Sequence, residues 1–584
     1  MESKKRNIPV MVVLVAVLAL LPYAKLFFGA EMTYSGYSIA NFISFSDDRA
    51  FWSLQTYGAN ALGRLFMMLP GGTTYIGIRA YCTFVISALN LMLFFELIKE
   101  YHIFPVYLGL LISNFMMWAP SVMLDYYLSY FLLAATVLLA ASGLKHGLRS
   151  RMFASGAMLG LCVFVRFSNL MAVLLVFPLL YYDFLCVKRV RSALKDVCFC
   201  SLGFFTGIAF VYTLTVITNG PDAFSRMLGS LRSIADAEYG YSISEMLMTF
   251  PAAIYRYYLW VLLVCGAIFI SIVLSYVDSS KKELNAIATF LSVFLTVFVI
   301  YILFRMKFLQ VFSTDYSEFK AVNIFVLSSL ILSTLFALID IWSQRANYMH
   351  KFLAMIVLVM IFVIPIGYNT GLASYQSAMI LFYPLSLGIL WDKMITRTSF
   401  RVSLFGIKNA TQNYMGRIGI GAVMIAVTMF QSFFFFVNFS YGTPGLKELN
   451  AKISYGPLKG TYETRINANT IDGLSLYFEG EGLKGSEIIT WGDIPLMTYA
   501  LECKSAFSTA WPDLDEYTET TFRRELSEMD KPVIVVNKHY AGGDPLNPVV
   551  WTYSEKAECL AKFMSDKNYD IRYENDIFRV YLAK

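Results

Sequence analysis

The chain has 584 residues, of which 57% are hydrophobic, 16% aromatic and 15% charged. Soluble globular proteins average about 25% charged residues, so this composition excludes an ordinary soluble protein. The net charge of +6 is not a nucleic-acid signature, because residues 440–584 contain 16 Lys and Arg against 22 Asp and Glu, whereas the rest contains 31 against 19. The positive excess lies in short loops beside apolar segments.

The apolar residues fall into blocks about as long as a membrane-spanning helix, which needs about 20 residues. Lipid offers the backbone no hydrogen-bond partners, so these blocks are predicted to be helices. The first block, Ile8–Phe28, follows Lys4, Lys5 and Arg6 but is too long for a signal peptide and no cleavage site follows it, so we expect a retained span. The thirteen predicted spans are 8–29, 76–98, 104–122, 126–144, 152–167, 169–187, 196–217, 252–276, 285–304, 322–342, 352–369, 375–391 and 417–438.

Loop charges predict the orientation of these spans. If the N-terminus is cytoplasmic and the sides alternate, the inside loops hold about 20 Lys and Arg and the short outside loops about 7. Shifting the register by one span would destroy this asymmetry. Because thirteen is odd, the segment 441–584 is predicted to lie outside the cell membrane.

The first outer loop, residues 30–75, carries a second helical pattern. Between Phe51 and Leu69 apolar residues recur at helical spacing, and Pro70 stops the pattern. This predicts an amphipathic helix in the membrane interface. Asp47 and Asp48 follow Ser46, which would cap such a helix at its start.

The last 144 residues read differently from the rest. Strand-like runs occur at Glu487–Trp491, Pro532–Val536 and Asp570–Tyr581, with helical stretches at Thr518–Met529 and Glu555–Phe563. We therefore divide the chain into a transmembrane domain, 1–440, and a soluble extracytoplasmic α/β domain, 441–584. Two of the eight cysteines, Cys503 and Cys559, lie in this domain and could pair in an oxidising space, whereas the other six lie in or beside apolar spans.

Ionisable groups at membrane depth or at its rim are costly, so each is a functional candidate. Asp47 and Asp48 come first, because a carboxylate at the outer face could act as general base toward an acceptor hydroxyl or amine. The alternative is structural, since acids in the first turn of a helix favour the helix dipole.

Arg166 is the second candidate, in an otherwise charge-free stretch where one span ends outside and the next begins. An arginine there could hold a lipid-linked phosphate through two parallel hydrogen bonds. It could instead extend to headgroups, or pair with Asp125 in the outer loop before the fourth span. Asp125 could orient Arg166 or contact the acceptor.

Five further residues near the outer face complete the predicted substrate-binding set. They are basic or amide side chains that could neutralise or approach a phosphate leaving group, although phospholipid headgroups would attract the same basic residues and the segment around Asn369 also fits a simple turn: Arg64, Arg256, Arg305, Lys307 and Asn369.

Several signatures are missing from the sequence. There is no P-loop, the cysteines show no metal-ligand spacing, and three of the four histidines fall in inside loops. No cofactor is predicted, and a divalent metal is left open without being signalled.

With these residues in view, the chain resembles membrane glycosyltransferases of the C-type fold, most closely the bacterial group akin to protein O-mannosyltransferases and aminoarabinose transferases. The resemblance covers the cytoplasmic N-terminus, the long first outer loop with its acidic residues, and the soluble outer domain. It implies a polyprenyl-phosphate-linked sugar as donor, Asp47 or Asp48 as catalytic acid-base residue, and Arg166 as a ligand of the lipid phosphate. The first loop carries Asp-Asp where mannosyltransferase-like members carry Asp-Glu, so the sugar is not carried over.

The expected partners are the lipid bilayer, the lipid-linked donor and a glycan, lipid or protein acceptor in the envelope of a bacterial cell, with no nucleic acid. Two other functions stay open: a transporter or flippase of a lipid-linked precursor, and a non-catalytic envelope scaffold. A transporter should show a pathway to both faces, whereas a transferase should gather Asp47 or Asp48 and Arg166 at one outer cavity.

Overall fold

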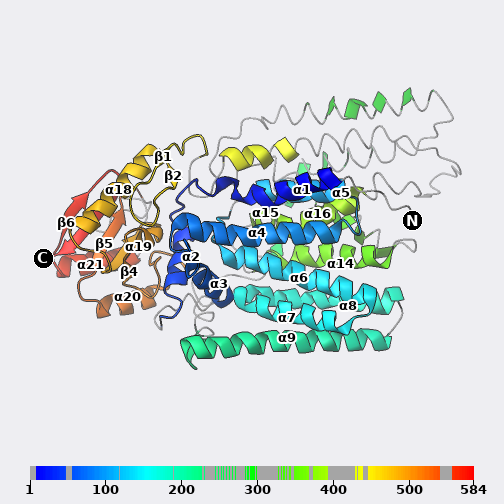
Figure 1. The fold of residues 1–584 in the computed structure, drawn as a ribbon, viewed down its shortest axis with the longest axis horizontal. Helices are drawn as coiled ribbons and strands as arrows, with labels where there is room; N and C mark the ends of the chain where they lie inside the picture. The colour runs from blue at the N-terminus through cyan, green and yellow to red at the C-terminus, as the bar shows by residue number, and fades with distance from the viewer. Residues whose placement is uncertain are drawn as a thin grey trace.

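A computed structural model describes residues 8–47, 56–117, 119–187, 190–226, 347–366, 373–391, 428–430, 432–438, 445–539 and 555–584, with scattered positions and short runs between 229 and 342. Figure 1 shows two parts, a bundle of long helices and a domain with a β-sheet at one end of the bundle. The sheet domain is formed by the C-terminal part of the chain.

Most of the described bundle consists of long apolar helices. Among the described residues, five stretches are long and apolar enough to cross a membrane: Ile8–Lys25, Tyr75–Leu97, Leu124–His146, Phe167–Phe184 and Ser192–Asn219. The predicted total of thirteen spans stays a prediction. The helices of the bundle are α1 (Ile8–Leu20), η1 (Leu21–Lys25), α4 (Tyr75–Leu97), α5 (Ile103–Phe115), α6 (Leu124–His146), α7 (Arg149–Val165), η3 (Phe167–Leu175), α8 (Val176–Tyr181), η4 (Tyr182–Val187), α9 (Val190–Asn219), α14 (Tyr348–Val363), α15 (Ala373–Ser377) and α16 (Met379–Trp391).

The predicted span 169–187 is not one regular α-helix. It consists of the 3₁₀ segment η3, the short α-helix α8 and the π-helical segment η4. Pro178 lies within α8, and a proline has no backbone N–H and collides with the carbonyl four residues earlier. Pro178 is tolerated because it lies in the first turn of α8, and its missing N–H leaves no α-helical hydrogen bond back to Leu174 in η3.

In the described part of the bundle, the helix ends gather at two opposite ends. The backbone N–H of Tyr75, at the start of α4, donates to Pro457 of the sheet domain. At the other end of the bundle, Lys145 pairs with Glu100 at 2.5 Å, and the ring of His102 stacks on Trp391. The first two described loops thus lie at opposite ends, and the side of the membrane that each end faces stays a prediction.

The described residues of the first outer loop contain two α-helices, whereas the sequence predicted one. Helix α2 (Tyr34–Ile43) was not predicted, and α3 (Tyr57–Met67) forms within the predicted helix 51–69. Ser46 and Asp47 follow the C-terminus of α2, in a turn where the N–H of Asp47 donates to Ser44. The expectation that Ser46 caps the interfacial helix is wrong, because α3 begins only at Tyr57.

A five-stranded sheet organises the C-terminal domain. Its order is β4-β3-β5-β7-β6, with β3 parallel to β4 and β5, and β7 antiparallel to β5 and β6. The predicted run 570–581 is two strands joined by a tight turn rather than one. The elements are β1 (Ala451–Lys452), β2 (Tyr462–Glu463), α18 (Arg465–Gly480), β3 (Glu487–Trp491), α19 (Leu496–Ala500), β4 (Lys504–Ser505), α20 (Glu519–Glu528), β5 (Val533–Asn537), α21 (Glu555–Asp566), β6 (Tyr569–Glu574) and β7 (Phe578–Ala583).

Alternate residues of the central strands enter two different cores. Ile488 belongs to the large core that continues into the bundle, whereas Ile489 belongs to a smaller core with Phe522 of α20. Cys503 lies in the first core and Cys559 packs against the second. Both are free thiols, because the sheet separates them.

The two parts of the molecule are joined through the backbone. Tyr462 of β2 donates to Phe27 and accepts from Gly29, directly after the first span. The N–H of Leu496 donates to Met32 at 3.0 Å. These contacts fix the sheet domain on the ends of the helices.

Candidate functional site

Arg166 and Asp125 come together at the domain end of the bundle. Arg166 is the residue between α7 and η3, with an extended backbone (φ −157°, ψ 124°), and Asp125 lies in the first turn of α6. The positive charge of Arg166 acts on the Asp125 carboxyl group, and its guanidinium carbon lies 4.8 Å from the ring centroid of Tyr126. The structure therefore places Arg166 near Asp125, which is the pairing that the sequence offered as one alternative for this arginine.

Asn169 closes the end of α7 beside this pair. Its side-chain amide donates to the carbonyl of Cys162 at 3.0 Å and to the hydroxyl of Ser129 at 2.7 Å. The backbone N–H of Arg166 also donates to Cys162. Because the last carbonyls of a helix lack intrahelical partners, these bonds fix where α7 stops and hold Arg166 at its end.

Tyr37 of α2 connects this pair to the sheet domain. Burial, and to a smaller extent the carboxylates of Glu516 and Asp125, raise the pKa of the Tyr37 hydroxyl, while a hydrogen bond with Asn41 opposes the rise. Its ring meets Trp511 edge-on, with centroids 6.0 Å apart. Elements from the bundle, the first loop and the sheet domain thus meet around Asp125.

The first loop also approaches the end of α7. Phe45 packs in one apolar cluster with Phe164, and its carbonyl accepts from Asn219 of α9 at 2.7 Å. Asp47 is exposed two residues later. The loop therefore carries Asp47 at the rim of the same helix end that presents Arg166, and its role as a base stays a prediction.

The other predicted residues divide into two groups. Arg64 is half-buried near the C-terminus of α3, a helix that packs against α4, α6 and α7. The remaining five lie outside the described residues: Asp48, Arg256, Arg305, Lys307 and Asn369.

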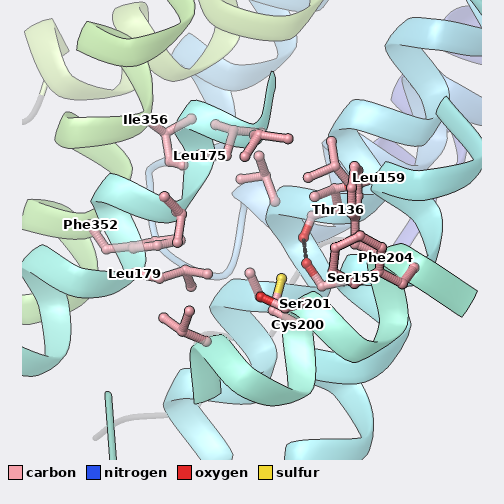
Figure 2. A pocket seen from close by; sticks show the side chains of 16 residues that line it. Thr136, Ser155, Leu159, Leu175, Leu179, Cys200, Ser201, Phe204, Phe352 and Ile356 are labelled. Carbon is pink, nitrogen blue, oxygen red and sulfur yellow. Dashed lines mark hydrogen bonds between the residues drawn. The ribbon is translucent and has the colours of Figure 1, made fainter. Parts of the chain in front are cut away.

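An apolar cavity of about 190 Å³ lies deeper in the bundle, between α6, α7, η3, α8, α9 and α14. Figure 2 shows Phe352 and Leu179 on one side of it, with Leu159 and Ser155 on the other. The hydroxyl of Ser155 donates to the carbonyl of Thr136 at 2.7 Å. The surface that lines the cavity is therefore mainly hydrocarbon. Two lining residues are exposed on the outside of the bundle, Val173 at 40% and Phe205 at 65%.

A second group of charged residues lies at the junction of the two domains. Arg79 of α4 donates to the carbonyls of Lys25, Phe28 and Gly29 at 2.8–3.0 Å, which satisfies the end of the first span. Glu31 accepts from backbone N–H groups at the start of α2. These bonds tie down the segment between the first span and the first loop.

Glu463 of the sheet domain completes this group. It is fully buried and accepts from Ala30 at 2.6 Å, from Thr464 and from the amide of Asn467. Burial raises the pKa of Glu463, and these donors and the charge of Arg79 oppose the rise. A cavity of about 90 Å³ lies beside the group, and because Arg79, Glu31 and Glu463 direct their hydrogen bonds to the surrounding backbone, we interpret the group as a structural junction.

Sequence reasoning missed this junction, although part of it was detectable. Lys25 and Arg79 both lie inside predicted spans, so the rule that flagged Arg166 applies to them as well. Glu31 and Glu463 carried no such signal, because nothing in the sequence shows that they become buried.

Within the described residues, no three His, Cys, Asp or Glu side chains are placed to hold a metal ion. The expectation about metals stays a prediction.

Comparisons with known proteins give a fold-level likeness. No family model matches the sequence, and no curated protein matches it. Among solved structures the chain is similar to the oligosaccharyltransferase of Archaeoglobus fulgidus. For the apo form the identity is 11% and the TM-score 0.46, over 92% of this chain and 70% of that chain.

Two further structures of that oligosaccharyltransferase give similar values. The form tethered to an acceptor peptide has 12% identity and a TM-score of 0.45, over 90% and 69% of the two chains. The complex with Zn and sulfate has 12% identity and a TM-score of 0.43, over 90% and 68%. Similarity at this level assigns no residue, so roles in this chain rest on its own contacts.

Proposed function

We propose that this chain transfers a sugar from a polyprenyl-phosphate donor to an envelope acceptor. The observation that supports this most is the position of Arg166. It ends α7 and precedes η3, and deeper in the bundle these two segments help enclose the apolar cavity. A cation at the rim with a hydrocarbon cavity beneath it suits a lipid that carries a phosphate.

The spacing along α7 supports this arrangement. Leu159 and Ser155, which line the cavity, precede Arg166 by seven and eleven residues. At 1.5 Å per helical residue they lie about 10 and about 16 Å deeper. A phosphate held by Arg166 would therefore place the first isoprene units of its lipid next to the cavity. The exposed Val173 and Phe205 give such a chain a lateral route from the bilayer.

In the proposed reaction, an acceptor hydroxyl or amine attacks the anomeric carbon of the sugar and the lipid phosphate leaves. Asp47 or Asp48 takes the acceptor proton as general base. Arg166 stabilises the negative charge that develops on the leaving phosphate, since a guanidinium can donate two parallel hydrogen bonds to it. Asp125 and Tyr126 position the guanidinium through charge and ring contact.

We further propose that the chain resides in a bacterial plasma membrane with its sheet domain outside. The loop charges support this orientation. A reporter that is active only outside the cytoplasm should work when fused after Lys584. Activity of a cytoplasm-only reporter at that position would contradict the orientation.

The test of the activity uses the purified full chain in lipid nanodiscs with a panel of polyprenyl-phosphate sugars and a set of hydroxyl and amine acceptors. The expected result is release of the lipid phosphate together with a glycosylated acceptor. If the protein instead moves the intact donor across vesicle membranes without releasing phosphate, the flippase alternative is correct. No phosphate release across the panel would contradict the proposal.

A further inference from the structure

The segment 445–466 lies directly on the ends of three helical segments. Leu446 donates to the carbonyl of Val437, in the helical stretch 432–438. Pro457 accepts from Tyr75, the first residue of α4, and Tyr462 pairs with the backbone that follows the first span. The segment therefore lies between the ends of these helices and the five-stranded sheet domain (Figure 1).

The exposed side chains of this segment are of two kinds. Three large residues remain exposed, Tyr455 at 44%, Tyr462 at 36% and Ile466 at 61%. They are accompanied by four exposed basic residues: Lys447, Lys452, Lys459 and Arg465. Aromatic and basic residues together are typical of surfaces that lie at headgroup level.

The charge of this segment differs from that of the domain that carries it. Residues 440–584 as a whole contain more acidic than basic residues. Of the two acids between 445 and 466, Glu463 is fully buried at the junction, and only Glu448 is exposed. Nearby, Asp472 accepts from the N–H groups of Ser454 and Tyr455. The outward-facing charge of the segment is thus positive.

We propose that Lys447, Lys452, Lys459, Arg465, Tyr455, Tyr462 and Ile466 form a collar that binds anionic phospholipid headgroups of the adjoining leaflet. The collar adjoins an exposed apolar residue that follows the first span. This residue is Phe27, which is 47% exposed and whose carbonyl accepts from the N–H of Tyr462. Anionic lipids attract each basic residue near the surface, by roughly fivefold in binding per residue. The collar holds the sheet domain against the membrane and so keeps Trp511 and Tyr37 in contact above Asp125.

The first experiment measures lysine reactivity in the full chain. The protein is placed in nanodiscs of phosphatidylcholine, alone or mixed with phosphatidylglycerol, and treated briefly with an amine-acylating reagent. Lys447, Lys452 and Lys459 should react several-fold more slowly with phosphatidylglycerol present, and high salt should reverse this. The exposed Lys504 and Lys562 serve as controls in the same molecule and should not change.

Other outcomes would overturn the proposal. Equal reactivity of the collar lysines in both lipids, or an equal loss at Lys504 and Lys562, excludes a specific lipid surface. If soluble glycerol phosphate protects the lysines as well as the lipid does, the segment is a small-phosphate site instead.

A matched pair of variants adds an independent measurement. Phosphatidylglycerol should raise the Tm of the wild-type protein, and Lys452→Gln with Lys459→Gln should remove most of that rise. Lys504→Gln with Lys562→Gln removes the same charge elsewhere and should preserve it. An undiminished rise in the collar variant would contradict the proposal.

Discussion

The guanidinium of Arg166 lies over the ring of Tyr126. The preceding residue, Asp125, carries the carboxyl group that interacts with the positive charge of Arg166. A cation–π contact uses the flat face of a guanidinium, whereas paired hydrogen bonds to a phosphate use its edge. The contact with Tyr126 therefore restrains the orientation of the group without competing for the same donors. Lysine cannot reproduce this geometry, because its ammonium group is not planar and cannot donate two parallel hydrogen bonds to one phosphate.

Arg166→Ala should weaken donor binding, seen as a large rise in KM for the lipid-linked sugar. Arg166→Lys should recover only part of the loss, since a point charge replaces a two-pronged contact. The control is Arg149→Ala at the opposite end of the same helix, where the guanidinium contacts the ring of Phe199 at 5.8 Å. Equal KM values for Arg166→Ala and Arg149→Ala would rule out the phosphate role.

Asp47→Asn and Asp48→Asn should differ sharply in transfer activity. Only one carboxylate need act as base, and loss of a general base costs about 10²–10⁴-fold in rate. One variant should therefore lose most of kcat while the other stays close to wild type, with both proteins still inserted in the membrane. Full activity in the double variant would remove both acids from the mechanism.

Ser201→Phe should reduce the preference for long-chain donors. Ser201 lines the apolar cavity from the exposed side of α9, so a phenyl ring there enters the space without displacing a buried group. Leu202→Phe is the control, because Leu202 is 57% exposed on the same helix and does not line the cavity. KM measured against donors of increasing chain length should rise in Ser201→Phe alone. Identical chain-length profiles would show that the lipid does not use this cavity.

Sequence patterns predicted the regular elements better than the places where they meet. The strand Glu487–Trp491 was predicted to the residue, because a short β-rich run between turns has few alternatives. Helix α2 was missed, because its start depends on Glu31, whose carboxylate accepts the free N–H groups of the first turn. Nothing local shows that Glu31 will be buried beneath a domain more than 400 residues later in the chain.

The candidate site shows the same division. A charge inside an apolar run is visible in sequence, so Arg166 was found and Lys25 and Arg79 could have been. The partners of Arg166 depend on tertiary packing: Tyr126 belongs to another helix, and Tyr37 reaches Asp125 only because the sheet domain holds α2 in place.

Gly36→Ala should loosen the sheet domain from the bundle. A Cβ at Gly36 would lie 2.1 Å from the backbone nitrogen of Leu496. Because the clash is with backbone atoms, α2 and α19 would have to move apart to relieve it. Overpacking of this kind costs about 1–3 kcal/mol. Gly480→Ala is the control, since a Cβ there meets nothing within 4 Å. Limited proteolysis should cut Gly36→Ala faster than wild type, whereas unchanged cleavage would show that the contact bears little of the docking.

A pair of carboxylates gives the sheet domain a pH dependence. Asp513 accepts from the N–H groups of Gly492 and Asp493 at 3.0 and 2.9 Å, and Asp493 accepts from the indole of Trp511 at 2.8 Å. Burial, and then the charge of Asp493, raise the pKa of Asp513 to about 7, while the two N–H donors oppose the rise. Burial also raises the pKa of Asp493. The pair therefore keeps a proton in the folded chain at a pH where an unfolded aspartate has lost it.

The stability of the folded chain should consequently fall as the pH rises from about 4 to about 7. In that window the folded state binds more protons than the unfolded state, so the free energy of unfolding decreases with pH, and above about 7 Asp513 is ionised in both states and adds no further slope. Lys556, whose pKa burial lowers to about 8, titrates above this window.

Asp513→Asn should flatten the decline in Tm between about pH 5 and about pH 7 and raise the Tm at the upper end. Asp566→Asn, at an exposed position on α21, should leave the wild-type slope intact. An Asp513→Asn slope equal to that of wild type would show that Asp513 is already ionised at the lower pH in the folded chain.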